Sequence, residues 1–302
     1  MSRRLEQALS RRGDRCAAND DVCRLVAGES DGLPGLVIDR IGAYAFATCH
    51  GPLSPELRSS LEAVVARCWL RGLTLRRRGQ GGRGEELLAL GEPVPEGLTI
   101  QEGPVRVQLR IQQQSLSYGI FPDLRPERLR VGAEARGLRV LNLYAYSGLF
   151  GIHAAHGGAA EVVQVDALKS MLAMIRANEA LNDVETRCIC EDALRYCQRL
   201  ARRGQQFDLV IHDPPTFGRT PKGKPRSTVK AMGEMLEATM AVVAPGGRLL
   251  SVINTASIGE KRVAAAHREA AKRMGRGLRK LRGLELADDA PGPLKGGWFR
   301  ID

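Results

Sequence analysis

The strongest constraint on the fold is a strand, turn, helix and strand pattern that runs from Val140 to Asp166. Residues 139–143 form a short apolar run typical of a buried parallel strand, and Gly148 closes the turn that follows. Apolar side chains then recur at helical spacing over residues 149–156, before a pair of glycines stops the helix. A second apolar run ends in Asp166. The segment therefore predicts a parallel βαβ unit.

The same alternation continues towards the C-terminus and predicts a doubly wound α/β sheet. Further strands are expected near residues 187, 209 and 249, helices at 167–181, 193–203, 228–243 and 258–274, and a final antiparallel hairpin from 278–286 and 298–301. A helix over 123–135 leads into this sheet. The residues before it read as a small α+β domain with a helix at 55–70 and one sheet from 22–27, 36–39, 44–49, 73–77, 87–90 and 105–111.

A nucleotide site is expected at the carboxyl ends of the parallel strands, where ligands of open α/β sheets bind. Asp166 is suited to accept hydrogen bonds from both hydroxyls of a ribose. Only Gly148 and Gly151 remain of a Gly-rich pattern, and Tyr144 and Tyr146 stand where close approach to a pyrophosphate favours glycine. The pattern disfavours a dinucleotide. It leaves open a ligand without a pyrophosphate or an ordinary βαβ unit with a turn glycine.

A second candidate site follows the predicted strand at residues 207–212, where the chain reads Asp213-Pro214-Pro215-Thr216-Phe217. Proline lacks the N–H donor and fixes φ, so the strand must end here and the chain must turn outward. A rigid loop of this kind suits a carboxylate and a backbone carbonyl that face a planar amine or ring nitrogen, with Phe217 stacked on a base. A plain proline-rich turn is the alternative.

Taken together, these motifs resemble the class I methyltransferases that use S-adenosyl-L-methionine, and within them the enzymes that modify bases of large-subunit (23S) ribosomal RNA. The resemblance spans about residues 22–302. It implies a Rossmann-like seven-stranded methyltransferase sheet in residues 122–302, preceded by a small α+β domain in residues 1–121 that positions the RNA. The matching motifs are residues 24–40, 119–125, 142–150, Asp166, 191–193, 213–217 and 294–296.

The resemblance also implies roles for single residues. The cofactor would be bordered at its methionine end by residues 142–148, held at its ribose by Asp166 and covered by residues 121–125, with its adenine against Asp192 and Ala193. Asp213 with Pro214 would orient the target nitrogen, and Phe217 would stack beneath the base. The cofactor-binding residues are thus Phe121, Asp123, Arg125, Asn142, Tyr144, Ala145, Ser147, Gly148, Asp166, Asp192 and Ala193, and the catalytic residues are Asp213, Pro214, Pro215 and Phe217.

Two departures from the family narrow the reaction. Members that make 5-methylcytosine attack the base with a cysteine that follows the strand after the motif matched by residues 213–217. Here that exit reads Asn254-Thr255-Ala256-Ser257, and no cysteine follows Cys197. A hydroxyl does not replace a thiolate without an added base. We therefore reject cytosine C5 chemistry and favour a purine nitrogen, which already carries a lone pair. The motif at residues 213–217, with Asn254 in place of a cysteine after the next strand, resembles the N7-methylguanine members most closely, and this resemblance implies guanine N7. The extra N-terminal RNA-binding domain of many relatives is not expected, because some 20 residues precede Arg24.

The distribution of charge favours RNA as the partner. Residues 1–134 carry 19 arginines, no lysine and 17 acids, whereas residues 135–302 carry 26 bases and 17 acids. A polyanion explains this excess, although a solvated basic helix face is the alternative for residues 261–282, which hold nine bases and one acid. The loop residues expected to contact RNA phosphates are Arg219, Lys222, Lys224 and Arg226.

Length and composition agree with a globular, two-domain intracellular enzyme. The resemblance implies a cytoplasmic enzyme that processes rRNA. No apolar run approaches a membrane span and no secretory signal precedes residue 14. The seven cysteines are expected to be reduced, and we assign no metal site. A homodimer is left open. Three alternatives also remain: a nicotinamide-dependent dehydrogenase, a methyltransferase with a non-RNA substrate, and a non-catalytic RNA-binding module of the same fold.

Overall fold

The computed structural model divides the chain into two compact units, which we describe separately. The first unit comprises residues 1–126 and 286–291, and the second comprises residues 127–285 and 292–302. The description covers residues 3–12, 21–78, 84–111, 117–215, 228–255, 257–289 and 293–302. Within these ranges no helix combines the length and the apolar character that a membrane crossing requires.

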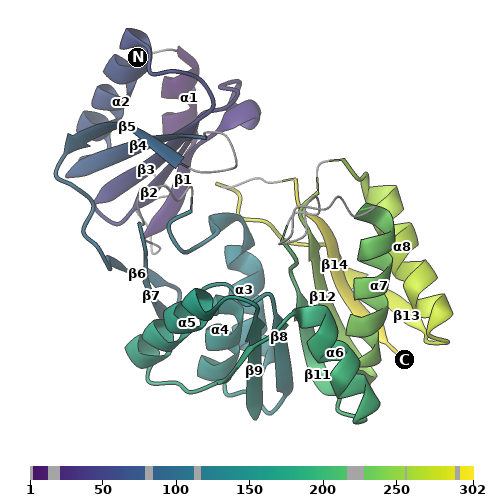
Figure 1. Ribbon diagram of the computed structural model, residues 1–302. Coiled ribbons are helices and arrows are strands. Elements are labelled where there is room, and N and C mark those ends of the chain that lie inside the picture. The colour runs from purple at the N-terminus through teal and green to yellow at the C-terminus, as the bar shows by residue number, and fades with distance from the viewer. Residues whose placement is uncertain are drawn as a thin grey trace. The chain divides into compact units, whose positions relative to one another are not determined.

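The first unit is built on a five-stranded sheet in the order β1-β2-β3-β4-β5. Helices α1 and α2 both pack on one face of this sheet, where Leu9, Leu61 and Leu75 are almost fully buried (Figure 1). Ser54 is the N-cap of helix α2, because its side chain accepts a hydrogen bond from Leu57 N (3.1 Å). The elements are α1 (Arg3–Arg12), β1 (Val22–Ala27), β2 (Val37–Ile41), β3 (Tyr44–Cys49), α2 (Pro55–Arg67), β4 (Gly72–Arg78) and β5 (Gly84–Gly91).

The first unit differs from the sequence-based expectation in three respects. Helix α1 was not expected, although its leucines at positions 5 and 9 share one face and are buried. The strand expected at 105–111 does not join the small sheet, because β7 (Val105–Gln108) pairs instead with the unexpected β6 (Thr99–Glu102) in a separate hairpin. Cys23 is disulfide-bonded rather than reduced. Sequence spacing alone shows no pairing geometry for a cysteine, so it could not reveal this bond.

The second unit confirms the expected doubly wound sheet, with seven strands in the order β10-β9-β8-β11-β12-β14-β13. The first five strands run parallel, and the last two form the expected antiparallel hairpin. These strands are β8 (Arg139–Leu143), β9 (Glu161–Asp166), β10 (Arg187–Cys190), β11 (Phe207–His212), β12 (Val243–Ile253), β13 (Leu278–Arg282) and β14 (Lys295–Ile301).

Helices cover both faces of this sheet (Figure 1). One face carries α6, α7 and α8, whose apolar side chains form the main core with the strands, and the other carries α3, α4 and α5. Central strands such as β11 are buried on both faces, which explains their nearly continuous apolar sequence. The helices are α3 (Arg125–Glu134), α4 (Leu149–His156), α5 (Lys169–Asn182), α6 (Ala193–Arg202), α7 (Thr228–Ala241) and α8 (Glu260–Arg273).

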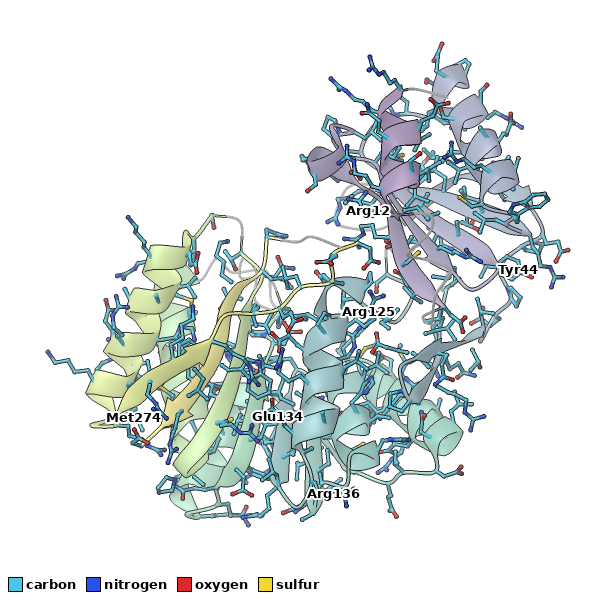
Figure 2. The ribbon with its side chains drawn as sticks, turned by 180° about the vertical axis from the view of Figure 1, so that it is seen from behind. Arg12, Tyr44, Arg125, Glu134, Arg136 and Met274 are labelled. Carbon is cyan, nitrogen blue, oxygen red and sulfur yellow. The ribbon has the colours of Figure 1, made fainter. Side chains whose placement is uncertain are left out.

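Helix α3 is attached to the C-terminal hairpin by carboxylates. Glu127 is fully buried and accepts hydrogen bonds from the Trp298 indole N–H (2.7 Å) and from Glu285 N (2.6 Å). At the other end of α3, Glu134, labelled in Figure 2, pairs with Arg248 and with Arg282 (2.8 Å). A buried carboxylate is stable only when such donors surround it. These contacts hold β12, β14 and β13 against the helix that precedes β8.

We predict that Glu127→Ala lowers the free energy of unfolding by about 3 kcal/mol, because it leaves the buried Trp298 indole N–H and the part-buried Glu285 N–H without their acceptor. Urea denaturation measures the change. The matched control is Glu161→Ala, which removes a half-exposed ion pair with Arg139 and should cost below about 1 kcal/mol. A loss of under about 1 kcal/mol at Glu127 would show that the indole and the amide find other partners.

Candidate functional site

The candidate site lies where two neighbouring strands end. Strand β8 pairs with β11 in parallel, with Leu143 opposite His212, so the turn at residues 144–148 and the segment at Asp213 leave the sheet at the same level. In the sheet, β9 and β10 lie on one side of β8, whereas β11 and β12 lie on its other side. This reversal of strand order is a topological switch point, the usual ligand crevice of open α/β sheets. The structure thus brings the two predicted motifs together.

The turn after β8 has an unusual backbone. Tyr144, Tyr146 and Gly148 have φ values of 57°, 52° and 81°, all in the left-handed region. Glycine adopts this region readily, but a tyrosine does so at a cost of roughly 1 to 2 kcal/mol. Non-glycine residues persist there only where the surrounding structure holds them, and such positions cluster at functional sites. The sequence pattern flagged both tyrosines as out of place and did not predict their conformation.

Asp166 holds this turn in place. Its Oδ2 accepts a hydrogen bond from Tyr146 N (3.0 Å), and its Oδ1 accepts one from Leu168 N (3.0 Å). The backbone adds a further bond from Ala145 N to Val165 O (2.9 Å). Each carboxylate oxygen has two lone pairs, so both oxygens can accept a second donor. Asp166 is only partly buried. A fixed carboxylate of this kind fits a ribose with two adjacent hydroxyls.

Leu168 was not predicted as a site residue. It follows the Asp166 carboxylate by two positions and leaves 58 % of its surface exposed. An exposed leucine beside a fixed carboxylate offers an apolar surface next to a polar anchor, which suits the flat face of a base attached to a ribose. No motif pointed to it, because an exposed leucine is common on protein surfaces.

A chain of buried, hydrogen-bonded polar side chains lies beneath the turn, and no sequence motif predicted it. Asn142 Nδ2 donates to Gln164 Oε1 (3.0 Å), and Gln164 Nε2 donates to the Thr186 hydroxyl (3.1 Å). The hydroxyl is bonded in turn to the Glu179 carboxylate, which also accepts from Thr186 N (3.0 Å). Gln164 is fully buried and Asn142 is 2 % exposed. These hydrogen-bonded side chains link β8, β9 and α5 below the candidate ligand surface.

Gly148 and Gly151, the glycines of the turn and helix after β8, make room for these hydrogen-bonded side chains. A Cβ on Gly151 would lie 2.4 Å from the Gln164 side chain, and one on Gly148 would lie 2.8 Å from Ile175 and 3.0 Å from Gln164. Separately, Ser147 is tied to α5 because its carbonyl accepts from Asn178 Nδ2 (3.0 Å). Both glycines are therefore required for packing, whatever the loop binds.

The motif at residues 191–193 starts helix α6 beside Asp166. Glu191 N donates to the Asp166 carbonyl (3.0 Å), and the Asp192 side chain caps the helix by accepting from Arg195 N (3.0 Å). Ala193 is buried. The ends of β9 and β10 are thus joined, so Asp192 and Ala193 follow the strand next to the one that carries the predicted ribose anchor.

An aromatic pair lies between the two motifs inside the core. The Tyr144 ring meets His212 edge to face, with centroids 5.8 Å apart. Burial raises the pKa of Tyr144 well above its usual value and, with His267 nearby, lowers the pKa of His212 to about 3. His212 is therefore a neutral, packed imidazole at neutral pH. In the part of the chain that the structure covers, no group of three or more His, Cys, Asp or Glu could hold a metal ion.

Several predicted residues cannot be placed at this site. Phe121, Asp123 and Arg125 belong to the first unit, where Phe121 is half exposed and Arg125 pairs with Asp289 (2.9 Å). Their predicted role in covering a cofactor stays a prediction. Asp213, Pro214 and Pro215 directly follow β11 as expected. The remaining predicted residues lie outside the described part of the chain: Phe217, Arg219, Lys222, Lys224 and Arg226.

Solved structures share this architecture. A protein from Streptococcus mutans described as a S-adenosylmethionine-dependent methyltransferase superposes with a TM-score of 0.84, at 20% identity over 99% of this chain and 79% of that chain. A methyltransferase crystallised with SAH gives a TM-score of 0.83, with the same identity and coverage. At this level of identity, the likeness concerns the fold.

The sequence comparisons concern the family itself. A ribosomal RNA large subunit methyltransferase of Deinococcus radiodurans is 32% identical over 95% of this chain and 74% of its own length. Ribosomal RNA large subunit methyltransferase I of Yersinia pseudotuberculosis is 32% identical over 82% of this chain, which spans 65% of that relative. The model of the S-adenosylmethionine-dependent methyltransferase family matches residues 56–289. The chain therefore belongs to the S-adenosylmethionine-dependent methyltransferases.

Proposed function

We propose that this protein transfers a methyl group from S-adenosylmethionine to a nitrogen of a purine in large-subunit ribosomal RNA, in the cytoplasm. The observation that carries the proposal is that the turn after β8, which Asp166 holds, and the segment Asp213-Pro214-Pro215 leave neighbouring strands at one switch point. The substrate class is supported by relatives named for large-subunit ribosomal RNA that match 95% and 82% of this chain.

The residues present fit the methyl donor. Asp166 can accept hydrogen bonds from both ribose hydroxyls while it keeps its bonds to Tyr146 N and Leu168 N. Leu168 offers an apolar surface for the adenine, and residues 144–148 border the methionine end. When bound, the donor supplies an electrophilic methyl on a sulfonium centre. The turn and the buried chain beneath it hold that end in one orientation, because Asn142 and Gln164 cannot move without breaking buried hydrogen bonds.

Asp213 and Pro214 are proposed to hold the target nitrogen. They emerge from β11 next to the turn of β8, and proline rigidity fixes the carbonyl and carboxylate that would face the base. A ring nitrogen already carries a lone pair, so catalysis requires alignment rather than a strong base. Phe217 would stack beneath the base, and residues 1–121 would position the RNA.

The cysteines support a nitrogen rather than a cytosine carbon as the target. Cys197 is buried in α6, and burial raises the pKa of its thiol to about 12. Burial also raises the pKa of Cys188. A thiol with a raised pKa supplies little thiolate at neutral pH. After β12, the chain offers Thr255, which is 2 % exposed, and no cysteine follows Cys197. Guanine N7 is the atom we favour.

The basic surface of α8 supports a polyanionic substrate. Lys261, Arg268 and Lys272 are seven and four residues apart, so they share one exposed face of the helix. No ion pair to these three occurs within the described residues. By contrast, Arg262 pairs with Glu269 (3.2 Å) and Arg273 with Glu237 (2.5 Å). The loop bases Arg219, Lys222, Lys224 and Arg226 are proposed to add further phosphate contacts.

Two experiments separate this function from its alternatives. Calorimetric titration should show binding of S-adenosylmethionine and none of NAD, since a dehydrogenase requires the reverse. Labelled methyl should then be transferred to fragments of ribosomal RNA, and not to free nucleosides or DNA. Transfer to a small molecule or a protein alone would contradict the RNA assignment, and donor binding without any transfer to RNA would favour a non-catalytic module.

Asp166→Ala should weaken binding of S-adenosylmethionine at least tenfold. It removes two hydrogen bonds to a charged acceptor, each worth about 1.5 to 3 kcal/mol, and releases the turn at Tyr146. Calorimetry measures the affinity, and circular dichroism checks that the variant is folded. Unchanged affinity in a folded variant would remove Asp166 from the donor site.

Replacing Cys188, Cys190 and Cys197 with serine should leave the single-turnover rate of methyl transfer within about threefold of wild type, because no step uses a thiolate. Some loss of stability is expected from the buried Cys197. RNA that contains 5-fluorocytidine tests the same point. A covalent protein–RNA complex with this probe would contradict the nitrogen assignment.

Replacing Lys261, Arg268 and Lys272 with glutamine should make the slope of log affinity against log salt shallower by about 0.7 to 0.9 per lost phosphate contact. Donor affinity should not change. The charge-matched control replaces Arg195, Arg202 and Arg203, which lie at α6 and its C-terminal cap. Equal changes in slope for both variants would show a general charge effect and would contradict a specific surface on α8.

A further inference from the structure

The first unit exposes a tryptophan that the proposed catalytic site does not use. Trp69 lies in the turn between α2 and β4, and 90 % of its surface is exposed. Trp298, the other tryptophan of the chain, is fully buried. The indole is the largest apolar side chain, and a position this exposed gives it almost no contact within the chain. Folding of the described chain therefore gains little from a tryptophan here.

The backbone at Trp69 also disfavours a tryptophan. Its φ is 52°, in the left-handed region. The turn closes the C-terminus of α2, since Cys68 N donates to Val64 O (2.9 Å) and Leu70 N donates to Val65 O (3.0 Å). This is the position at which helices usually carry glycine, because a Cβ is strained there. Neither packing nor conformation within the described chain favours an indole here, which makes Trp69 a candidate contact for a bound partner.

The surroundings of Trp69 indicate the chemistry of that partner. Arg67 and Arg71 flank the turn in the sequence. Burial raises the pKa of Cys68, and the positive charges of Arg40 and Arg67 nearby partly offset this rise. Arg67 donates to Ser10 Oγ (3.0 Å). Arg71 pairs with Glu92 (2.5 Å) and lies 5.7 Å from the ring centre of Tyr44, which Figure 2 labels.

The contacts with Ser10 and Glu92 hold the guanidinium groups of Arg67 and Arg71 near the turn, and a net positive charge remains there. Glu92 neutralises one of the three arginines, and the side chain of Arg71 is still 59% exposed. An exposed aromatic ring among cations is the combination that binds single-stranded nucleic acid, in which bases stack on the ring and phosphates meet the cations. A protein partner would use the ring without needing the excess of arginine.

We propose that Trp69 is a stacking platform for an unpaired RNA base, with Arg67 and Arg71 contacting the adjacent phosphates. The inference rests on the proposed function, since it assigns part of the same RNA to the first unit. It adds a contact surface at the end of α2 and the turn before β4, which holds single-stranded substrate independently of the methyl donor.

Fluorescence tests the contact directly, because Trp298 is buried and acrylamide reaches mainly Trp69. Titration of the full-length protein with a short single-stranded oligoadenylate should quench the emission and protect it from acrylamide. Trp69→Phe should retain most of the affinity, since phenylalanine also stacks. Trp69→Gly should lower the affinity roughly tenfold or more.

Stability distinguishes this role from a structural one. Glycine adopts a φ of 52° without strain, so Trp69→Gly should unfold at an equal or higher denaturant concentration than wild type. A structural role predicts the opposite change. Unchanged RNA affinity in Trp69→Gly would overturn the proposal, as would loss of self-association in sedimentation without loss of RNA binding. RNA affinity and the denaturation midpoint are both measured without methyl transfer. Failure of the proposed function would be seen separately, as a wild-type protein that transfers no methyl to RNA.

Discussion

The hydrogen bonds of Asp166 are the constraint on which the rest of the site depends. Its carboxylate joins the turn of β8 to the end of β9, and its carbonyl accepts from Glu191 N at the end of β10. Three neighbouring strand ends are thereby held at one edge of the sheet. The left-handed tyrosines of the turn cost roughly 1 to 2 kcal/mol each, and hydrogen bonds to a charged acceptor offset a cost of that size. A carboxylate that already organises the turn needs little rearrangement to receive a ligand.

The buried polar chain explains why this turn keeps one shape. Gln164 is fully buried and bonded at both ends, so any movement of β8 against β9 would leave an amide without a partner. Gly148 and Gly151 allow helix α4 to approach this amide closely. The same residues that resemble a ligand-binding Gly motif are therefore fixed by internal packing. The turn after β8 thus has one conformation that serves both donor binding and packing of the sheet. It stays rigid despite its strained backbone because buried contacts hold it.

Much of the second unit could be predicted because its signals are local. Apolar runs, glycine stops and the proline pair mark β8, β9 and β11 in the sequence, and parallel pairing then brings Tyr144 and Asp213 together. The series of side-chain hydrogen bonds from Asn142 to Glu179 could not be predicted. It joins side chains on different elements, and their relative positions are set only by the folded structure. The pairing of β6 with β7 was missed for a similar reason: four-residue strands carry too little periodicity to indicate a partner. Leu168 and Trp69 were missed because exposure is a property of the folded chain.

The central claim is that Asp166 binds the ribose hydroxyls of the methyl donor, and a thermodynamic cycle tests it most directly. S-adenosylhomocysteine and its 2′,3′-dideoxy analogue would be titrated by calorimetry into the wild-type protein and into Asp166→Ala. The account predicts a coupling energy of about 2 kcal/mol, because both changes remove the same hydrogen bonds. A coupling energy near zero, with both variants folded and binding, would contradict it.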